Sequence, residues 1–549
     1  MASSILDIAA SALRTTQKQL DTTGHNIANV NTEGYSRQRV QTATREPQFS
    51  GFGYLGTGVQ ATSIRRNYDD FLTNRLRQAT TGYSDIDTFH RLTTQIDDMV
   101  ADPDLGVSSA MQNFFNAVHD VADDPTSIPA RQTLLTEAGT LTDRFNTLDA
   151  RLKEIGNQSR HDLQNNLKEV NSLAGEIAAL NAKIVYEQGK SQGKPPNDLL
   201  DKRDQLIMQL AEKVDVTPVS QDNGAINVFI GNGQQLVADS HASQLGLKPN
   251  DLDPNVQEVT LTSGSDTLTI TSTLSGGELG GLLRFQNDVL TPSENKLGRL
   301  AASLAGEFNQ IHEAGYDLDG NTGTSFFNLG SPPISVLQNG TGTVSASYDT
   351  ATLSNLQASD YRLDYDGSNY TLTRLSDQTK TTLNASDFPH TQDGIKIAVT
   401  SAPTGPASFL IRPTADAAAK INLAISDPRA IAAAASDTSG GAVGDNGNAL
   451  SLAGLESAKK MLGGNATFQD SYGQLVAEVG TQTRSAQISR SAHETLKQQA
   501  TQAREEVSGV NLDEEAANLL RFQQAYQAAA QVISVASQTF DTLLGAVRR

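Results

Sequence analysis

The stretch NIANVNTEGYSRQRV, residues 26–40, follows a strongly helical sequence and changes its character abruptly. Asn side chains compete with the backbone for its hydrogen bonds, and Gly adopts left-handed conformations without steric cost. We therefore expect a helix to end within Asn29–Gly34 and the chain to change direction there. This polar turn predicts a joint between the preceding helix and the rest of the molecule.

The helix before this turn carries a regular apolar stripe. Large apolar side chains recur every seven residues, at Leu6, Leu13, Leu20 and Ile27, which places them along one side of a helix. Helices of this length are only marginally stable in water by themselves. The stripe therefore predicts a partner helix.

The other end of the chain offers that partner. A second seven-residue series runs through Leu512, Leu519, Tyr526, Ile533 and Phe540. Ala516, Ala530 and Leu544 occupy what we predict to be the second position of the same seam. We predict that the two series form the assembly seam of a terminal coiled-coil domain. An ordinary pair of core helices would show the same pattern and is the alternative.

Composition narrows the class of protein. A chain of 549 residues is too long for one ordinary core and predicts several domains. Its formal net charge of −20 argues against nucleic acid and anionic membranes as partners. The absence of Cys excludes disulfides and thiolate metal sites. There is no apolar run of membrane-spanning length and no signal-peptide pattern in MASSILDIAA, so by ordinary signals the chain looks cytoplasmic.

Periodicity along the chain predicts an α+β multidomain fold. Helical spacing dominates the body, whereas Val214–Leu274 and the Ser-, Thr- and Gly-rich stretch after Gly330 alternate with period two, as β-strands do. We expect three units: a terminal coiled-coil domain (1–45 and 506–549), a discontinuous, mainly helical body (46–329 and 414–505) with β-hairpins at about 214–274, and an inserted β-rich outer domain (330–413).

Several segments imitate functional motifs without completing them. GFGYLG, residues 51–56, has the glycine spacing of a dinucleotide-binding turn but lacks the strand before it and the helix after it. DLDGNTG, residues 317–323, opens like a calcium loop but lacks its Gly and its final Glu. QGKS, residues 188–191, lacks the first glycine of a phosphate loop, and His312 and His493 each lack the second histidine of a zinc-peptidase helix. We predict no catalytic residue, no cofactor and no metal site, and leave weak cation binding by DLDGNTG open.

Both termini resemble the axial proteins of the bacterial flagellum. ANVNTEGYSRQRV, residues 28–40, resembles the turn that follows their first helix, and SGVNLDEEAANLLRFQQAYQAAAQVISVASQTFDTLLGAV, residues 508–547, resembles their last helix. Among rod, hook and hook-associated proteins, the combination is most similar to the hook-associated protein 1 family, the first of two kinds of hook-filament junction protein. YDLDGNTGTSFF and GDNGNALSLAGL point the same way.

The resemblance implies a structural protein of the flagellum and not an enzyme. It implies polymerisation at the hook-filament junction, and an extracellular protein exported by the flagellar type III apparatus without a cleaved signal peptide. Implied partners are further copies of this chain, the hook protein, the second junction protein and an export chaperone at the C-terminal helix.

The turn itself is expected to join inner and outer domains. We predict joint or interface roles for Asn29, Asn31, Gly34, Tyr35, Arg37 and Arg39. Arg37 and Arg39 are expected to pair with acidic groups of adjacent subunits. A helix stop with solvated arginines is the simpler alternative, because exposed ion pairs contribute little.

Two other functions are consistent with the sequence. A hook or rod protein would share the termini and differ in its neighbours. A secreted hydrolase with coiled-coil arms would require an active site within the β-rich insert.

Overall fold

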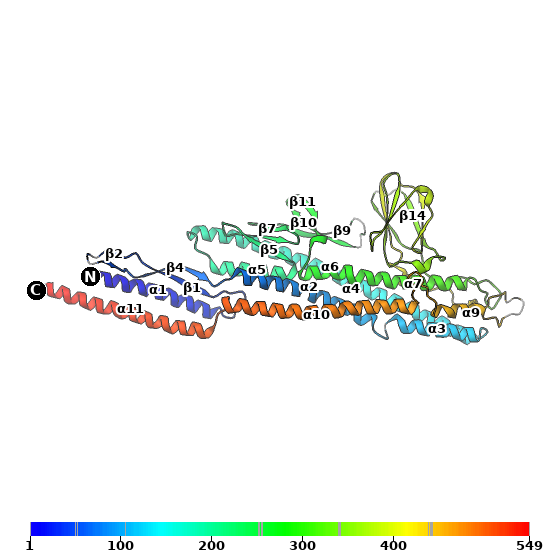
Figure 1. Ribbon diagram of the computed structural model, residues 1–549, viewed down its shortest axis with the longest axis horizontal. Helices are drawn as coiled ribbons and strands as arrows, with labels where there is room; N and C mark the ends of the chain where they lie inside the picture. Colours follow the sequence, from blue (N-terminus) through cyan, green and yellow to red (C-terminus); the bar gives the residue numbers. More distant parts are fainter. Residues whose placement is uncertain are drawn as a thin grey trace.

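The protein is an elongated molecule in which long helices run parallel to its longest axis (Figure 1). The computed structural model describes residues 2–49, 51, 53–104, 106–250, 253, 256–338, 342–437, 439 and 443–547. Both chain termini lie at the same end of the molecule, and a β-rich domain projects sideways near the other end.

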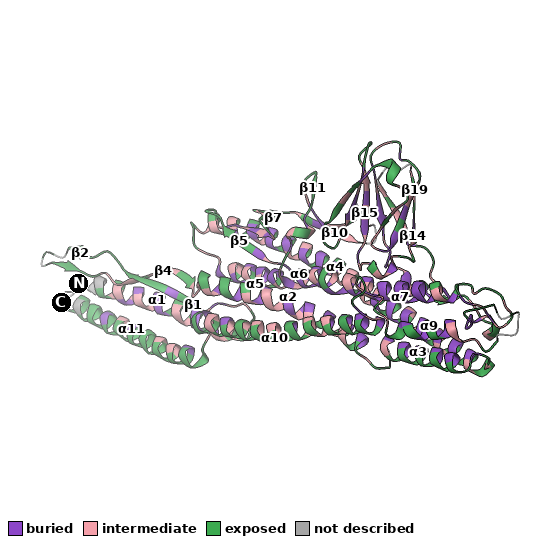
Figure 2. Cartoon of the chain, turned by 45° about the vertical axis from the view of Figure 1, so that its right-hand side comes forward, coloured by how far each residue is buried: buried purple, intermediate pink, exposed green. Residues whose placement is uncertain are grey.

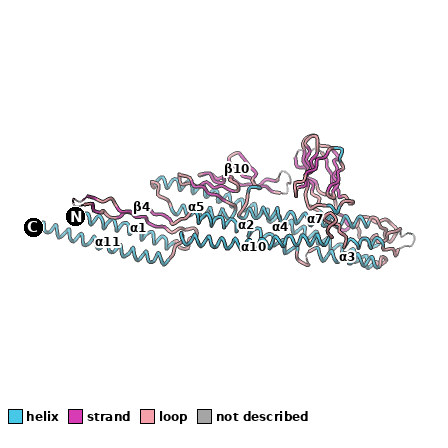
Figure 3. The backbone as a smooth tube through the Cα atoms, in the orientation of Figure 1, coloured by secondary structure: helices cyan, strands magenta, loops and turns pink. Residues whose placement is uncertain are grey.

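The terminal unit combines two helices with a long β-ribbon. Helix α1 (Ala2–Ala28) and helix α11 (Leu512–Val547) lie side by side. Strands β1 (Gln38–Thr44) and β4 (Val59–Arg66) pair antiparallel with a bulge at Gln41/Thr42, and β2 (Gln48–Phe49) with β3 (Tyr54–Leu55) extends the ribbon. The ribbon runs along α1 (Figure 3).

Long helices build the body. They are α2 (Asp70–Val100), α3 (Val107–Asp123), α4 (Ile128–Lys190), α5 (Asn197–Lys213), α6 (Gly277–Phe285), α7 (Thr291–His312), α9 (Gly447–Ala453) and α10 (Phe468–Ser508). Side chains cap the starts of α2 and α10: Asp69 accepts from the backbone N–H of Leu72, and Thr467 and Asp470 form a capping box.

Helices α6 and α7 form one rod with a π-helical turn between them. This turn, Gln286–Leu290, shifts the phase of the apolar stripe that the sequence carries at seven-residue spacing. Leu283, Leu290, Leu297 and Leu304 are all buried in the core of the body.

Two small sheets cover the body between α5 and α6. One has the strand order β5-β6-β7-β8 and the other β11-β10-β9. Their strands are β5 (Val216–Ser220), β6 (Ile226–Ile230), β7 (Gln234–Ala238), β8 (His241–Ala242), β9 (Gln244–Pro249), β10 (Gln257–Ser263) and β11 (Asp266–Thr269).

The projecting domain consists of two antiparallel sheets, ordered β13-β20-β15-β16-β17 and β14-β19-β18. Its strands are β13 (Ile334–Gln338), β14 (Thr343–Tyr348), β15 (Tyr361–Tyr365), β16 (Tyr370–Arg374), β17 (Lys380–Leu383), β18 (His390–Gln392), β19 (Ile395–Ser401) and β20 (Ala407–Ile411). Below it, β12 (Phe327–Asn328) pairs with β21 (Asn422–Leu423), and α8 (Ala417–Lys420) packs on α7.

Burial divides the molecule into two apolar cores. One runs the length of the helical body, and the other lies between the two sheets of the projecting domain and reaches α7 at Ala302. Figure 2 shows buried residues concentrated in these parts, whereas α11 is largely exposed. The α+β multidomain fold expected from the sequence is confirmed, with helical termini, a helical body and a β-rich insertion.

One segment is organised differently from the expectation. The helical body was expected to begin at residue 46, so that it would include residues 59–66. Instead, β4 pairs with β1 and lies against α1, so the ribbon packs with the terminal helices. Only the tertiary structure shows that the partner of β4 is β1.

Candidate functional site

Small side chains are buried at regular intervals on both terminal helices, which lie side by side. On α1, the buried positions Ala9, Thr16 and Thr23 recur every seven residues. On α11, Ala529 and Ala536 are buried with the same spacing. Small side chains allow two helix axes to approach closely. The two helices run antiparallel, since the N- and C-termini lie at the same end (Figure 1).

The predicted seam residues lie on the same two helices. Leu6, Leu13, Leu20 and Ile27 of α1, and Leu519 and Ile533 of α11, are partly buried. Leu512, Tyr526 and Phe540 are 36–52% exposed. The two series are thus brought onto neighbouring helices, and they keep part of their apolar surface in solvent.

The second position of the seam differs from the prediction. Ala516, Ala530 and Leu544 are exposed, whereas the buried residues are Glu515, Ala529 and Ala536. These lie three residues after Leu512, Tyr526 and Ile533, not four. The sequence favoured a spacing of four residues because Glu515 is charged. A charged residue is not expected at a buried position, so the first residue of the buried series was not recognised.

Asn26 is the centre of the joint between helix α1 and ribbon strand β1. Its side-chain oxygen accepts hydrogen bonds from the hydroxyl of Tyr35 (2.8 Å) and the backbone N–H of Gln38 (2.9 Å). Its side-chain nitrogen donates to the Gln38 carbonyl (3.0 Å) and to Glu515 Oε2 (3.1 Å). A buried Asn with two acceptor and two donor bonds is fully satisfied. Asn26 begins the polar stretch of residues 26–40, but the sequence indicated no role for it.

Arg37 connects the start of α11 to this joint. Its guanidinium lies 2.7 Å from Glu515 Oε1 and 2.6 Å from Glu514 Oε2, and its backbone N–H donates to the Ser508 carbonyl (2.8 Å). Glu515 is only 2% exposed at its side chain, so Arg37 compensates a buried charge. Within one chain, the partners of Arg37 are therefore Glu514 and Glu515, and its pairing with acidic groups of adjacent subunits stays a prediction.

The other predicted joint residues have distinct positions. Gly34 has a φ of 79°, and a Cβ there would come within 3.1 Å of the Gln205 side chain. Asn29 donates from its side chain to the His25 carbonyl (2.9 Å), which ends the helix. Asn31 and Arg39 are exposed, and neither forms a side-chain hydrogen bond or ion pair with any described residue.

Helix α5 supplies acidic anchors that the sequence did not reveal. Asp201 accepts from the Ser36 backbone N–H (3.0 Å) and from Arg66 (2.7 Å), which also pairs with Asp204 (2.6 Å). Burial raises the pKa of Asp201, opposed by these bonds. Burial, together with nearby carboxylates, raises the pKa of Tyr35 well above its usual range. The joint therefore connects three elements that are far apart in the sequence.

An open groove of about 730 Å³ lies beside the joint. The turn after α1 forms one wall, and the end of α10 with the start of α11 forms the other. Its charged lining comprises Glu33, Arg37, Arg504, Glu505, Glu506 and Glu514. Arg37 is occupied by Glu514 and Glu515, so the groove is acidic overall.

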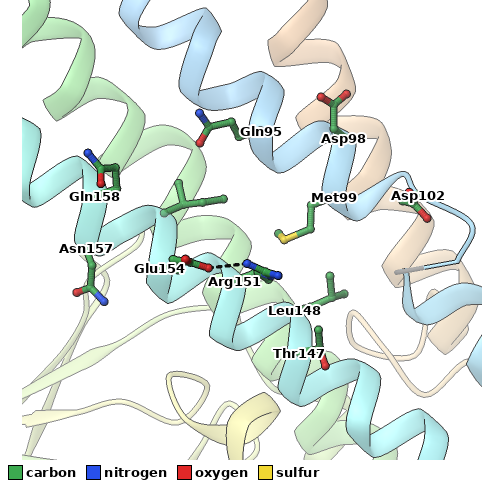
Figure 4. A pocket seen from close by; sticks show the side chains of 11 residues that line it. Gln95, Asp98, Met99, Asp102, Thr147, Leu148, Arg151, Glu154, Asn157 and Gln158 are labelled. Atoms are coloured by element: carbon green, nitrogen blue, oxygen red, sulfur yellow. Dashed lines mark hydrogen bonds and ion pairs between the residues drawn. The ribbon is translucent and has the colours of Figure 1, made fainter.

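A second hollow of about 850 Å³ lies between α2 and α4 (Figure 4). Its lining includes Met99, Leu148 and Ile155, and the Arg151–Glu154 ion pair (2.8 Å) crosses part of it. Among the described residues, no three His, Asp or Glu side chains are grouped to hold a metal ion. Neither this hollow nor the groove beside the joint is lined by a set of side chains that indicates an enzymatic reaction.

The incomplete motifs have structural roles. His312 is buried; its Nδ1 lies 2.6 Å from the Thr324 carbonyl, and its Nε2 accepts from the Ala432 backbone N–H (3.0 Å). Burial lowers its pKa. In DLDGNTG, Asp317 accepts from the backbone N–H groups of Asp319 and Asn321. Within the described part of the chain, no helix has the length and apolar character needed to cross a membrane.

Models of known protein families match successive parts of the chain. "Flagellar hook-associated protein FlgK helical domain" matches residues 93–327, and "Flagellar hook-associated protein 1, D2-like domain" matches 334–413. The termini match "Flagella basal body rod protein" (6–35) and "Flagellar basal body rod FlgEFG protein C-terminal" (501–546).

Full-length relatives agree with these matches. Flagellar hook-associated protein 1 of Salmonella typhimurium is 35% identical over 99% of both chains, and that of Escherichia coli K12 is 34% identical over 99% of both. A solved structure, the flagellar hook junction protein FlgK from Burkholderia pseudomallei, superposes with a TM-score of 0.71 at 26% identity, covering 79% of this chain and all of that one. The chain therefore belongs to the flagellar hook-associated protein 1 family.

Proposed function

We propose that this chain is a structural subunit of the flagellum that polymerises at the junction between hook and filament through its terminal helices. It acts there as a mechanical adaptor between the two structures and has no catalytic role. Family membership supports the location, and the terminal unit supports the mode of assembly.

The observation that carries this proposal is the apolar surface of α11. Leu520 (59% exposed), Val532 (44%) and Val535 (55%) leave much of their apolar surface in solvent. Burying one such side chain contributes about 1.5–3 kcal/mol. A neighbouring subunit that covers this face would gain that energy, whereas the monomer does not.

The body suits the mechanical role. Helices α4 and α10 span 63 and 41 residues and lie lengthwise with the other body helices. Bending such a bundle disturbs many close-packed side chains at once, which makes it stiff. The projecting β-domain is expected to lie outermost, with the terminal unit nearest the axis.

The remaining partners follow from the same proposal. We assign the hook protein and the second junction protein as axial neighbours, the flagellar type III apparatus as the export route, and α11 as the segment that an export chaperone holds. The working location is then extracellular, and export requires no cleaved signal peptide.

A complementation experiment tests the proposal. In a strain lacking its own hook-associated protein 1, a labelled copy of this chain should localise to the hook-filament boundary and restore filament attachment. Val535→Asp should reduce attachment at least tenfold, because it places a charge on the apolar face. Tyr186→Asp, at an exposed position of the body, is the matched control and should assemble normally.

Two outcomes would contradict the proposal. Label distributed along the whole hook or rod would indicate a different axial protein. Normal filament attachment with Val535→Asp would show that the apolar face of α11 is not an assembly surface.

A further inference from the structure

We propose that the exposed pair Arg39 and Arg65 on the ribbon of one subunit docks into the acidic groove beside the joint of a second copy of this chain. The inference rests on the proposed function, since it assumes that copies assemble with one another. It identifies a contact surface separate from the apolar face of α11.

The ribbon has one covered face and one free face. Gln38 and Val40 of β1 are buried, and Arg66 pairs with Asp201 and Asp204. Arg39 and Arg65 lie between these positions and point the other way, into solvent. Neither forms a side-chain hydrogen bond or ion pair with a described residue.

The two arginines are direct cross-strand neighbours. Residues paired in this way hold their Cβ atoms about 4.5–5.5 Å apart, and like charges there are destabilising. A partner carboxylate placed between them would turn this repulsion into two charge-assisted bonds. The Arg39–Arg65 pair is therefore suited to bind an anion, and no described residue of the monomer pairs with it.

The groove beside the joint provides suitable carboxylates. Glu33, Glu505 and Glu506 line it, and none of them forms an ion pair with a described residue. Arg504, the other cation of the lining, donates to the Gly34 carbonyl at 3.4 Å. The acidic groove and the basic pair thus belong to the same chain. Within one monomer, neither Arg39 nor Arg65 lines the groove.

Charge complementarity favours a second copy as the occupant. The chain has a formal net charge of −20, so two copies repel one another unless a basic patch meets an acidic one. Where the pair of one copy meets the groove of the next copy in a series, the contact is head-to-tail. Such contacts continue from copy to copy and generate rings or helical arrays.

Cross-linking between copies tests the contact directly. The chain has no Cys, so an engineered Cys is the only thiol present. Arg39→Cys and Glu506→Cys are placed in separately tagged copies, produced together, and assembled flagella are treated with a short bis-maleimide. A product carrying both tags is expected. Arg75→Cys, exposed on α2, replaces Arg39→Cys in the control and should give at least tenfold less product.

Charge reversal provides the second test. Arg39→Glu with Arg65→Glu should lower assembly at least tenfold while leaving the monomer's Tm unchanged, because both positions are exposed. Adding Glu505→Lys and Glu506→Lys to the same chain should restore assembly. If the reversed pair lowers Tm, Arg39→Gln with Arg65→Gln replaces it and should also weaken assembly.

The outcomes separate this inference from the proposed function. If flagella assemble at the junction but show no doubly tagged product, or if the reversed pair assembles normally, the inference is wrong and the proposed function stands. If the unaltered chain localises elsewhere but the cross-link forms, the contact stands and the proposed location is wrong.

Discussion

The helical body and the terminal unit both consist largely of helices but are held together differently. In the body, Phe114 is fully buried with its ring centroid 5.2 Å from that of Phe308 and 5.8 Å from that of Phe327. In the terminal unit, the buried small residues include Ala and Thr, and Asn26, Arg37 and Glu515 are joined by hydrogen bonds. The body is stabilised by apolar burial, and the terminal unit by a polar network that leaves apolar surface for assembly.

The largest effect should follow from opening the body core. Phe114→Ala removes a ring enclosed by other aromatic rings and should lower the free energy of unfolding by about 3–5 kcal/mol. Chemical denaturation of the full chain, followed by far-UV circular dichroism, measures this change. Tyr186→Ala, which removes a 67% exposed ring from the same body, should change stability by less than about 0.5 kcal/mol. If both variants lowered the free energy of unfolding by the same amount, burial of the Phe114 ring would not be what stabilises the body.

A smaller and local effect should follow from breaking the joint. Arg37→Ala leaves Glu515 buried without its cation and should favour local opening of α11 by about 2 kcal/mol. Hydrogen exchange of the α11 backbone amides should then accelerate by roughly 30-fold, while the body is unaffected. Arg39→Ala is the control, because Arg39 is two residues away and pairs with none of the residues that the structure describes. Unchanged exchange in Arg37→Ala would show that packing alone holds α11 in place.

The smallest effect concerns a carboxyl group at the contact between the body and the projecting domain. Burial raises the pKa of Glu294 from its usual value of 4.5 to about 7, and Arg412 only partly opposes this. The folded protein therefore holds a proton that the unfolded chain releases between pH 4.5 and 7. This group's contribution to stability is greatest below pH 4.5 and decreases as the pH rises through 7.

Glu294→Gln should remove that pH dependence. At pH 8 the variant should be more stable than the original chain by on the order of 1–2 kcal/mol, and the difference should shrink toward pH 5. Thermal unfolding at several pH values measures it. Glu154→Gln, at an exposed carboxylate of α4, should leave the pH profile unchanged. A constant difference across the pH range would mean that Glu294 is ionised in the folded protein.

Sequence patterns predicted the helices well and their detailed contacts less well. The stripes through Leu13 and Ile533 indicated two helices that need partners, and the structure places them side by side. The buried series on the two helices was missed because its residues are Ala, Thr and Glu, which do not stand out as apolar. A search for small residues at seven-residue spacing, such as Ala529 and Ala536, would have found part of it.

The partner of Arg37 could not be predicted. Glu514 and Glu515 lie 477 and 478 residues away in the sequence, and many other carboxylates were equally available. Similarly, Asp201 and Asp204 looked like ordinary polar positions of α5 until the fold placed Arg66 beside them. Local patterns carry no information about which distant charges meet.

The sequence by itself determined the elements: helices from apolar periodicity, the end of α1 from Asn29 and Gly34, and the β-rich insertion from its alternating composition. These features depend on interactions between residues a few positions apart. The tertiary structure alone decided that Arg37 links the two ends of the chain, whereas Arg39 and the apolar face of α11 stay exposed. Which surfaces are covered depends on packing between distant segments, and the residues left uncovered are the ones available to a neighbouring subunit.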